Sequence, residues 1–238
     1  MKPKNFSIIV PVYNEAGNIR PLVEEINAAV GSEPFELIYV DDCSSDETCQ
    51  QILELRQRNP WLRLIRHHTR CGQSTALRTG VKASRAPVIV TLDGDGQNNP
   101  ADLPRLLSTL ANTPGIVCVC GYRRQRRDSG LKKLSSKIAN SVRARLLRDD
   151  TPDTGCGLKV FYREDFLDLP YFDHMHRFLP ALFRRTGGRT VSVEVNHRPR
   201  HAGYSKYGLH NRLWVGIIDL LGVIWLQRRA KLTETTEE

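Results

Sequence analysis

The chain has 238 residues, with 40% hydrophobic and 26% charged side chains, which is ordinary for a soluble globular protein and leaves room for one large α/β domain with an appendage. Its net charge of +9 predicts a polyanionic partner: a nucleic acid, an anionic membrane surface or a phosphorylated substrate. Six cysteines without any CxxC spacing argue against a zinc site and favour reduced thiols in a cytosolic setting. The first apolar run begins within a few residues of Met1, so we expect no secretory signal peptide.

Apolar runs that alternate with helical segments characterise the first half of the chain. We expect strands at residues 6–10, 36–40, 62–66 and 88–92. Helices are expected up to about Val30, from a serine-capped start to about Arg58, and from Gly72 to about Arg85. This order with short connections predicts an α/β fold, a doubly wound and mostly parallel sheet with helices on both faces.

The strand at residues 88–92 ends on two acids. Asp93 and Asp95 alternate with Gly94 and Gly96, and Gln97 follows. In an open α/β sheet, ligands bind at the carboxyl ends of the strands. Both carboxylates could face one hard cation there, with Gln97 offering a further oxygen. The alternative is a solvated Asp-Gly turn.

Other polar residues end the neighbouring strands and predict a nucleotide pocket. Asp41 and Asp42 can accept hydrogen bonds from a base or ribose, and Tyr13 can supply an aromatic or hydroxyl contact. The first turn lacks the GxGxxG fingerprint and the P-loop lysine motif, which weakens hydride transfer and NTP hydrolysis as interpretations. We expect Asp46 to start a helix, and Asn14 and Gln73 to be turn or cap residues rather than site residues.

Three motifs in the first half together resemble the GT-A glycosyltransferases of family 2: residues 11–15, residues 40–42 with Asp46, and residues 93–95 with Gln97. The resemblance implies a Rossmann-like GT-A fold, a UDP- or GDP-linked sugar donor and a Mg²⁺ or Mn²⁺ ion. It assigns nucleoside contacts to Pro11, Tyr13, Glu15, and Asp41 or Asp42, and the ion and the donor diphosphate to Asp93, Gly94, Asp95 and Gln97. Gly94 stands where the family usually has alanine or another small residue.

The second half carries most of the basic residues. A strand at residues 116–121 leads to Arg123, and a basic amphipathic helix is expected from about residue 131 to 148, with Leu146 on its apolar stripe and Arg143 among its basic residues. Such a helix suits an anionic membrane or a phosphate-bearing acceptor, and the alternative is a solvated face. Residues 153–158 predict a glycine-rich turn into a strand. Residues 200–207 predict a basic loop able to close over a diphosphate, or else a plain surface loop.

These later stretches are similar to the polyprenyl-phosphate glycosyltransferases, the group that includes dolichol-phosphate mannosyltransferase, so that the resemblance covers nearly the whole chain. It implies that the lipid phosphate binds Arg123, Lys133, Ser135 and Ser136, and that catalysis rests on Asp95 together with Arg200 and Lys206 on the diphosphate. Lys132 and Lys133 stand where the group commonly has an arginine pair, so bidentate geometry is lost there. No QxxRW motif follows Asp173, which fits an acceptor phosphate that is already anionic and needs no base. We expect His174 and His176 to be structural or interfacial.

The organisation expected from the sequence is a catalytic domain over residues 1–207, with a nucleotide-binding half up to residue 100 and an acceptor-binding half from residue 101. A helix over residues 208–230 and a disordered tail over residues 231–238 follow. The apolar run at residues 213–226 is too short as a helix to span a bilayer, and its two tryptophans suit an interfacial helix, with a core or dimer helix as the alternative. We therefore expect an inverting transfer to an undecaprenyl- or dolichyl-type phosphate, by a protein held peripherally at the cytoplasmic face of the inner membrane, alone, as a homo-oligomer or with a membrane partner.

Three other functions compete with this interpretation. A hydroxyl acceptor in lipid A or polysaccharide synthesis would require a base, for which Asp153 and Asp173 are candidates. A nucleotide-sugar-binding subunit without activity of its own would need a membrane partner. A nucleic-acid partner is not expected, because the basic residues lack an interleaved stacking platform and the sequence shows neither a helix-turn-helix nor a zinc-finger pattern.

Overall fold

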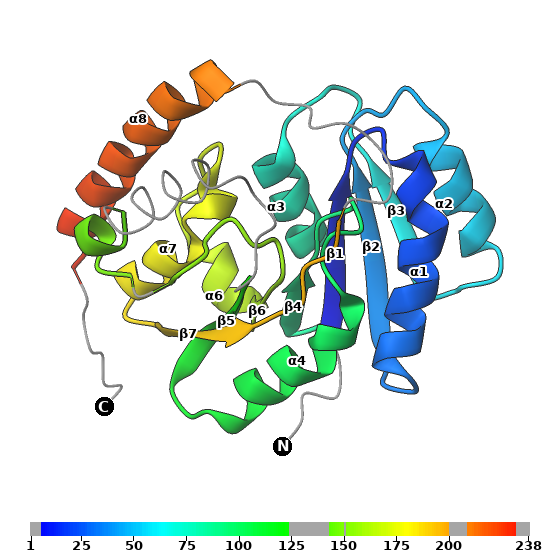
Figure 1. Cartoon of the computed structure of the whole chain (residues 1–238), viewed down its shortest axis with the longest axis horizontal. Coiled ribbons are helices and arrows are strands. Elements are labelled where there is room, and N and C mark those ends of the chain that lie inside the picture. The colour runs from blue at the N-terminus through cyan, green and yellow to red at the C-terminus, as the bar shows by residue number, and fades with distance from the viewer. Residues whose placement is uncertain (1–5, 124–142, 150, 200–208, 232–238) are drawn as a thin grey trace, which may run out of the picture.

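The structure is a computed structural model that describes residues 6–123, 143–149, 151–199 and 209–231. A seven-stranded sheet runs through it in the order β3-β2-β1-β4-β6-β5-β7 (Figure 1). The strands are β1 (Phe6–Val12), β2 (Phe35–Asp41), β3 (Leu62–Arg66), β4 (Val88–Thr91), β5 (Ile116–Tyr122), β6 (Lys159–Tyr162) and β7 (Arg189–Glu194). All neighbouring strands pair in parallel except β6, which pairs antiparallel with both β4 and β5. The predicted mostly parallel α/β fold is confirmed.

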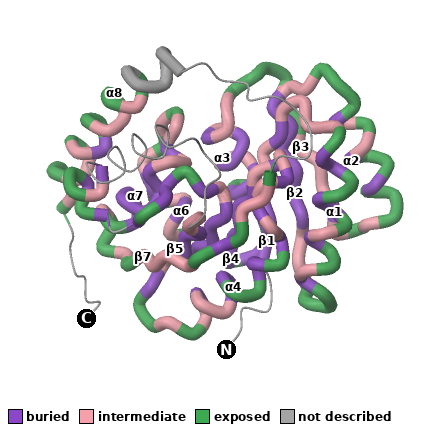
Figure 2. The backbone as a smooth tube through the Cα atoms, in the orientation of Figure 1, coloured by how far each residue is buried: buried purple, intermediate pink, exposed green. Residues whose placement is uncertain are grey.

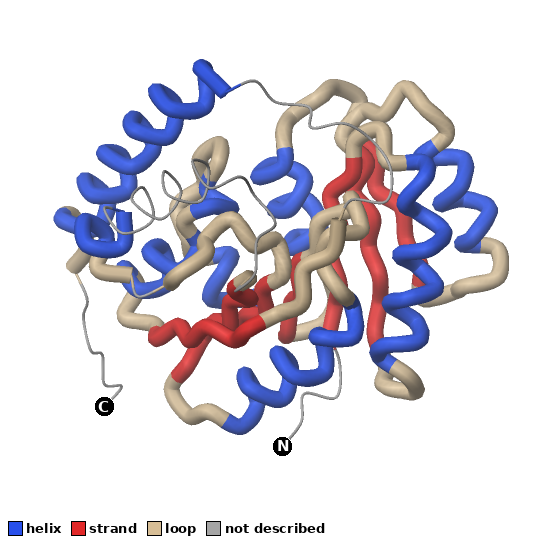
Figure 3. The backbone as a smooth tube through the Cα atoms, viewed as in Figure 1, coloured by secondary structure: helices blue, strands red, loops and turns tan. Residues whose placement is uncertain are grey.

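Helices cover both faces of this sheet (Figures 1 and 3). They are α1 (Ala16–Val30), α2 (Thr48–Arg56), α3 (Gln73–Ala83), α4 (Leu103–Asn112), α6 (Arg163–Leu167), α7 (Leu179–Arg185) and α8 (Leu209–Arg228), with short 3-10 turns η1 (Pro100–Asp102) and η2 (Met175–Arg177). Each expected strand and helix of the first half is present, with bounds that agree with those read in the sequence to within two residues.

The sheet separates two hydrophobic cores, and successive side chains of β1 contribute alternately to one core and the other. Ile8 and Val10 pack with α1, α2 and α4 on one face, whereas Ile9 packs with α3 and α7 on the other. Because successive strand residues point to opposite faces, a strand buried on both sides is apolar along most of its length, as β1 is apart from Ser7. Figure 2 shows the buried backbone concentrated along the sheet. These two cores hold the strands rigidly and leave their carboxyl ends for function.

The start of α2 corrects one local prediction. No serine caps this helix; instead Asp46 Oδ1 accepts hydrogen bonds from the backbone N–H and the hydroxyl of Thr48, at 3.0 and 2.5 Å. Ser44 lies earlier in the loop, where its hydroxyl accepts a hydrogen bond from the backbone of Asn14 at 2.8 Å. Asp46 therefore lies two positions before the helix and holds its first residue, Thr48, in place of a serine cap.

The expected basic helix at residues 131–148 is described only from residue 143, where residues 143–147 are helical. There the predicted pattern is wrong at two positions. Arg143 is buried, with Nη2 donating to Asp149 Oδ1 at 3.1 Å and to the carbonyl of Thr151 at 2.7 Å, while Leu146 is exposed. A buried ion pair has replaced the solvent contact that a surface arginine would have. The remaining residues of that segment lie outside the described ranges.

The C-terminal helix α8 lies beside α7 (Figure 1). Val223 is buried against the second core, Gln227 Nε2 donates to the carbonyls of Leu147 and Ala181 at 3.0 and 3.3 Å, and Arg185 Nε donates to the carbonyl of Leu226 at 3.0 Å. Further apolar side chains point away from the protein: Val215, Ile217, Ile218, Leu221 and Trp225 are exposed. Within the described part of the chain, each helix is too short or too polar to traverse a bilayer.

Candidate active site at the carboxyl ends of β1, β2 and β4

The parallel register of three strands brings their following loops to one edge of the sheet. Val12 of β1 lies opposite Asp41 of β2, and Ile9 of β1 lies opposite Thr91 of β4. Backbone hydrogen bonds continue past the strands, from Asp42 N to the Val12 carbonyl at 2.9 Å. The loops that carry Tyr13, Asp42 and Asp93 are therefore neighbours, as expected for a ligand-binding edge.

The loop after β4 holds the acid pair in a compact turn. A side chain at Gly94 would place its β-carbon 2.5 Å from Cγ1 of Val12, so only glycine allows the loop to pack this closely on β1. Gly96 has a φ of 71°, the left-handed region that favours glycine. The backbone N–H of Gln97 then donates to Asp95 Oδ1 at 3.1 Å. Close packing at Gly94 and the positive φ at Gly96 both favour glycine over other residues. Together the two glycines place Asp93 and Asp95 at the rim.

Asp93 is held from two sides. Gln73 Nε2 donates to Asp93 Oδ1 at 2.9 Å, and the backbone N–H of Asp93 donates to Oδ1 of the buried Asn98 at 3.3 Å. Burial, and next the negative charge of Asp95, raise the pKa of Asp93 to about 6, against the lowering effect of Lys159, Arg123 and the Gln73 hydrogen bond. A carboxylate that is desolvated beside a second carboxylate gains stability from a nearby cation.

The turn at residues 154–158 completes the surroundings of Asp93. A β-carbon on Gly157 would lie 2.2 Å from the Asp93 carboxylate, so the missing side chain makes room for the acid. Thr91 Oγ1 donates to the Gly157 carbonyl at 2.6 Å, and the buried Lys159 donates from Nζ to the carbonyls of Thr154 and Cys156. The turn is thus anchored to β4 and β6 with its glycine against the acid.

This donor set fits a hard divalent cation. Two carboxylates and the amide side chain of Gln97 are the oxygen ligands that Mg²⁺ and Mn²⁺ accept. Gly157 leaves the carboxylate of Asp93 space that any other residue would fill. The predicted ligands Asp93, Asp95 and Gln97 lie within one short loop, and their binding of an ion stays a prediction.

Arg198 forms a further set of hydrogen bonds that hold the acid loop, residues 93–98. The guanidinium of Arg198 donates to both carboxylate oxygens of Glu25 on α1, at 3.0 and 2.6 Å, and to the carbonyls of Gly96 and Asn98, at 3.2 and 3.1 Å. Two parallel hydrogen bonds between a guanidinium and a carboxylate define geometry as well as attraction. Arg198 therefore ties the acid loop to α1.

The residues expected to hold the nucleoside divide into two groups. Tyr13, Pro11 and Glu15 are partly exposed at the rim; the guanidinium of Arg70 stacks on the Tyr13 ring at 4.1 Å, and Glu15 Oε2 accepts from Asn18 at 2.7 Å. Their contact with a nucleoside stays a prediction. Asp41 is instead fully buried and accepts hydrogen bonds from Ser44 N at 3.2 Å and from the Cys49 thiol at 3.0 Å. Its position indicates that it holds the loop after β2.

Asp42 is also buried and joins three segments. Its Oδ1 accepts from Cys71 N at 2.8 Å and lies 2.8 Å from His67 Nδ1, and its Oδ2 accepts from Gly72 N at 2.8 Å. Gln73 directly follows Gly72. The sequence predicts a turn or cap role for it, and in the structure its side chain contacts Asp93. Asp42 thus positions the turn that brings Gln73 to the acid pair.

Arg123, predicted to bind a lipid phosphate, lies in a bidentate ion pair. Its Nε and Nη2 donate to the two carboxylate oxygens of the buried Asp153, at 2.6 and 3.0 Å, and its backbone N–H donates to the same carboxylate at 3.2 Å. The pair places a guanidinium near the acid pair, where it lowers the pKa of Asp93. Five other predicted residues lie outside the described ranges: Lys133, Ser135, Ser136, Arg200 and Lys206.

Sequence reasoning missed four residues around Asp93: Asn98, Gly157, Lys159 and Arg198. Gly157 belongs to the turn that the sequence predicts to be glycine-rich, and Lys159 begins the strand after it, but their separation from Asp93 (157 − 93 = 64 and 159 − 93 = 66 positions) gives no sign that they meet. Their role follows from the antiparallel pairing of β6 with β4, which places the turn before β6 over the end of β4. His176 Nδ1 lies 2.7 Å from the Ser74 hydroxyl and His174 Nδ1 lies 3.1 Å from Asp219 Oδ2. These contacts support the structural role expected for both histidines, which stays a prediction.

Solved structures of similar fold include glycosyltransferases. Glucosyl-3-phosphoglycerate synthase from Mycobacterium tuberculosis, in complex with Mn²⁺, UDP and phosphoglyceric acid, aligns with a TM-score of 0.68 at 21% identity, over 98% of this chain and 80% of that one. A mannosyltransferase from Pyrobaculum calidifontis, in complex with GDP-Man and Mn²⁺, aligns with a TM-score of 0.67 at 21% identity, over 98% and 66%. At this identity the likeness shows the GT-A fold.

Relatives with higher sequence identity identify the family as well as the fold. Dodecaprenyl-phosphate galacturonate synthase of Rhizobium johnstonii is 35% identical over 228 residues, which cover 93% of this chain and 67% of that protein. Undecaprenyl-phosphate 4-deoxy-4-formamido-L-arabinose transferase of Pectobacterium carotovorum is 33% identical over 208 residues, 86% and 63%. The chain thus spans about two thirds of the length of these curated relatives. The model of the family Glycosyl transferase family 2 matches residues 7–169, so the chain belongs to glycosyl transferase family 2.

Proposed function

We propose that this protein transfers one sugar from a nucleoside-diphosphate sugar to a polyprenyl phosphate. The observation that carries the proposal is the 35% identity, over 93% of the chain, to a dodecaprenyl-phosphate galacturonate synthase. The site geometry supports it, because the partly desolvated acid pair lies at the rim where the three parallel strands end. The sugar and the nucleotide, UDP or GDP, are left open by this proposal.

In this proposal Asp93, Asp95 and Gln97 hold Mg²⁺ or Mn²⁺, which supplies positive charge to the departing nucleoside diphosphate. Tyr13, Pro11 and Glu15 contact the nucleoside, and Gly94 contributes to the donor site by letting the acid loop pack closely on β1. Gln73 and Asn98 orient Asp93 through the hydrogen bonds described above. Arg200 and Lys206 add positive charge on the diphosphate, and a single in-line displacement inverts the anomeric carbon.

The acceptor brings its own negative charge in this reaction. A phosphate oxygen is already an anionic nucleophile, so the chain needs no base to deprotonate it. Asp153, one candidate base for a hydroxyl acceptor, is buried and paired through both oxygens with Arg123. We assign Arg123, Lys133, Ser135 and Ser136 to the acceptor phosphate.

A polyprenyl acceptor also requires access to a membrane. The exposed apolar residues of α8, together with Arg228 and Arg229 at its end, support peripheral attachment at the cytoplasmic face of the inner membrane. Aliphatic and tryptophan side chains enter the interface while the arginines meet anionic headgroups. Attachment of this kind would bring the acceptor phosphate to the enzyme.

A transfer assay tests the proposal. Purified protein is incubated with a polyprenyl phosphate, Mn²⁺ or Mg²⁺ and a panel of UDP- and GDP-linked hexoses, hexosamines and uronic acids, and the lipid product is weighed by mass spectrometry. We expect one donor to give a lipid heavier by one glycosyl residue. Asp95→Ala is expected to lower the rate by at least about 100-fold, an electrostatic loss of about 2.7 kcal/mol or more, with an unchanged circular dichroism spectrum. Unchanged turnover in that variant contradicts the metal assignment.

One observation favours a hydroxyl acceptor as the second candidate. Asp173 is largely exposed, and its Oδ1 lies 3.5 Å from the β-carbon position of Gly72, beside the turn that carries Gln73. Asp173→Asn separates the candidates. With a phosphate acceptor we expect the rate to stay within about twofold, whereas a general base contributes about 10²–10⁴-fold. A loss of that size would favour the hydroxyl acceptor, and absence of turnover with all donors would favour a binding subunit.

A further inference from the structure

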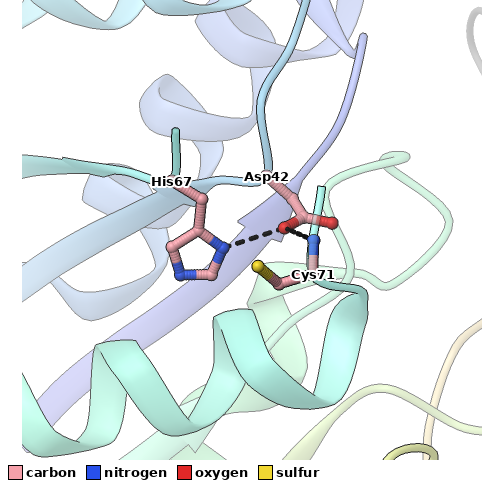
Figure 4. Close-up of side chains that lie close together, drawn as sticks. All are labelled: Asp42, His67 and Cys71. Atoms are coloured by element: carbon pink, nitrogen blue, oxygen red, sulfur yellow. Dashed lines mark hydrogen bonds and ion pairs between the residues drawn. The ribbon is translucent and has the colours of Figure 1, made fainter. Parts of the chain in front are cut away.

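A cluster of three different ligand types lies beside the nucleotide rim, at the ends of β2 and β3 and before α3. Asp42, His67 and Cys71 each offer one ligand atom, and these atoms lie within 4.8 Å of one another. Figure 4 shows the Cys71 sulfur directed toward the His67 ring and the Asp42 carboxylate. Asp42 and His67 are buried or nearly so, while Cys71 is exposed and opens the cluster to solvent.

We propose that Asp42, His67 and Cys71 bind a zinc-type divalent cation at a site separate from the acid pair. Thiolate and imidazole ligands prefer Zn²⁺ and similar ions, whereas the oxygen ligands of Asp93, Asp95 and Gln97 suit Mg²⁺ and Mn²⁺. The two sites therefore select different metals. The thiolate and the carboxylate together offset the charge of a divalent ion.

The neighbours of the cluster are arranged to support such a site. His67 Nε2 lies 3.0 Å from the Thr79 hydroxyl on α3. The ring nitrogen that would not bind the ion therefore has a hydrogen-bond partner, as in most metal-ligating histidines. Ligands of a tetrahedral zinc ion lie roughly 3.5 Å apart. Asp42 Oδ1 and His67 Nδ1, which are 2.8 Å apart, must therefore separate slightly, and no two of the ligand atoms lie more than 4.8 Å apart. Asp42 keeps its hydrogen bonds from Cys71 N and Gly72 N, which fix the loop.

Binding of the ion replaces one hydrogen bond of the cluster and releases one proton. The Asp42–His67 hydrogen bond, 2.8 Å from Nδ1 to Oδ1, gives way to the ion. The neutral imidazole keeps one proton, moved to Nε2, where it donates to the Thr79 hydroxyl, and the Cys71 thiol releases its proton to solvent. No oxidant or further reactant is involved.

This site was not expected from the sequence, where the lack of CxxC spacing argued against zinc. Asp42 follows β2, whereas His67 and Cys71 lie together in the loop between β3 and α3. Asp42 and His67 are 25 positions apart, so the complete ligand set does not form one short sequence motif. The turn they share continues into Gln73, whose amide bonds Asp93. An ion at the cluster would thus be connected to the acid pair through three consecutive residues.

Cobalt binding tests the proposal without an activity measurement. The full-length, metal-free protein is titrated with Co²⁺ under argon, and thiolate-to-cobalt charge transfer is followed in the near ultraviolet. We expect one equivalent to produce the band, Zn²⁺ to abolish it, and a tenfold excess of Mg²⁺ to leave it unchanged. No stoichiometric thiolate band, or its displacement by Mg²⁺, would overturn the proposal.

Matched variants identify the ligands. Cys71→Ser replaces an exposed, nearly isosteric side chain and is expected to abolish the band, and His67→Gln to weaken Co²⁺ binding at least tenfold. Cys43→Ser, on the neighbouring loop, and Asp93→Asn are expected to keep it, because neither residue belongs to the cluster. A band that survives in Cys71→Ser, or that disappears in Cys43→Ser or Asp93→Asn, would show that the ion binds elsewhere.

Discussion

Gln73 and Asp93 are joined by a hydrogen bond from the amide Nε2 to the carboxylate Oδ1, 2.9 Å long, although 20 residues separate them. Gln73 is the first residue of α3, and the two residues before it donate their backbone N–H groups to Asp42. The loop after β2 and the loop after β4 are thereby connected through one turn. The position of Asp93 therefore depends on residues that lie outside its own motif.

Gln73→Leu removes this hydrogen bond with little change in volume. We expect the dissociation constant for Mn²⁺ to rise at least about tenfold, because a hydrogen bond to a charged group contributes about 1.5–3 kcal/mol. Isothermal titration calorimetry measures the change. Gln50→Leu is the control, since Gln50 Nε2 contacts Glu54 on the exposed side of α2. Equal affinities in wild type and Gln73→Leu would exclude a positioning role.

Asp93→Asn is expected to stabilise the metal-free protein while abolishing transfer. The pKa of Asp93 is raised from 3.8 to about 6, so the folded state binds more protons than the unfolded state between these values, and the free energy of unfolding falls as pH rises through that window. The penalty removed is at most about 3 kcal/mol at pH 8 and about half of that at pH 5. The acid loop keeps its shape, because asparagine can still accept the Gln73 hydrogen bond.

Thermal unfolding in EDTA at the two pH values tests this sign. We expect Tm of Asp93→Asn to exceed that of wild type by several degrees at pH 8, with a smaller gain at pH 5, at about 2–4 °C per kcal/mol. Asp173→Asn, an exposed carboxylate, serves as control and should leave Tm unchanged. A gain that grows toward pH 5 would contradict the raised pKa.

Gly157→Ala places a methyl group against the carboxylate of Asp93. Its β-carbon would lie 2.2 Å from the Asp93 carboxylate, so either the acid or the turn must move. We expect transfer activity and Mn²⁺ affinity to fall at least about tenfold, equivalent to about 1.4 kcal/mol. Gly222→Ala, in α8 with nothing within 4 Å of its β-carbon, should keep both and raise helix stability slightly. Full activity in Gly157→Ala would show that Asp93 tolerates displacement.

The outer side of α8 is expected to bind anionic vesicles. Ile218 and Leu221 are 67% and 60% exposed, and replacing both by glutamate removes apolar contact and adds negative charge facing the lipid. We expect the fraction that sediments with phosphatidylglycerol vesicles to fall at least about tenfold, as two partly buried side chains contribute about 1.4 kcal/mol or more. Leu53→Glu, at an exposed leucine on α2, is the control. Equal sedimentation of the double variant would exclude α8 as the attachment surface.

The sequence was sufficient to predict the alternation of strands and helices, the mostly parallel sheet and the rim with its acid pair. Those properties follow from local patterns: apolar runs such as residues 88–92 are buried strands, and carboxylates directly after them lie at the strand ends. Gly94 and Gln97 could be placed with Asp95 for the same reason, since they are neighbours in the chain.

Tertiary structure alone decided which distant side chains meet the acids. The insertion of antiparallel β6 between β4 and β5 brings Gly157 against Asp93 and buries Lys159 beneath the turn. Likewise, parallel pairing of β2 with β3 brings His67 to Asp42. These contacts depend on strand order and on how loops pack, which a single sequence does not encode as a local pattern, because residues far apart along the chain become neighbours only when the sheet has assembled.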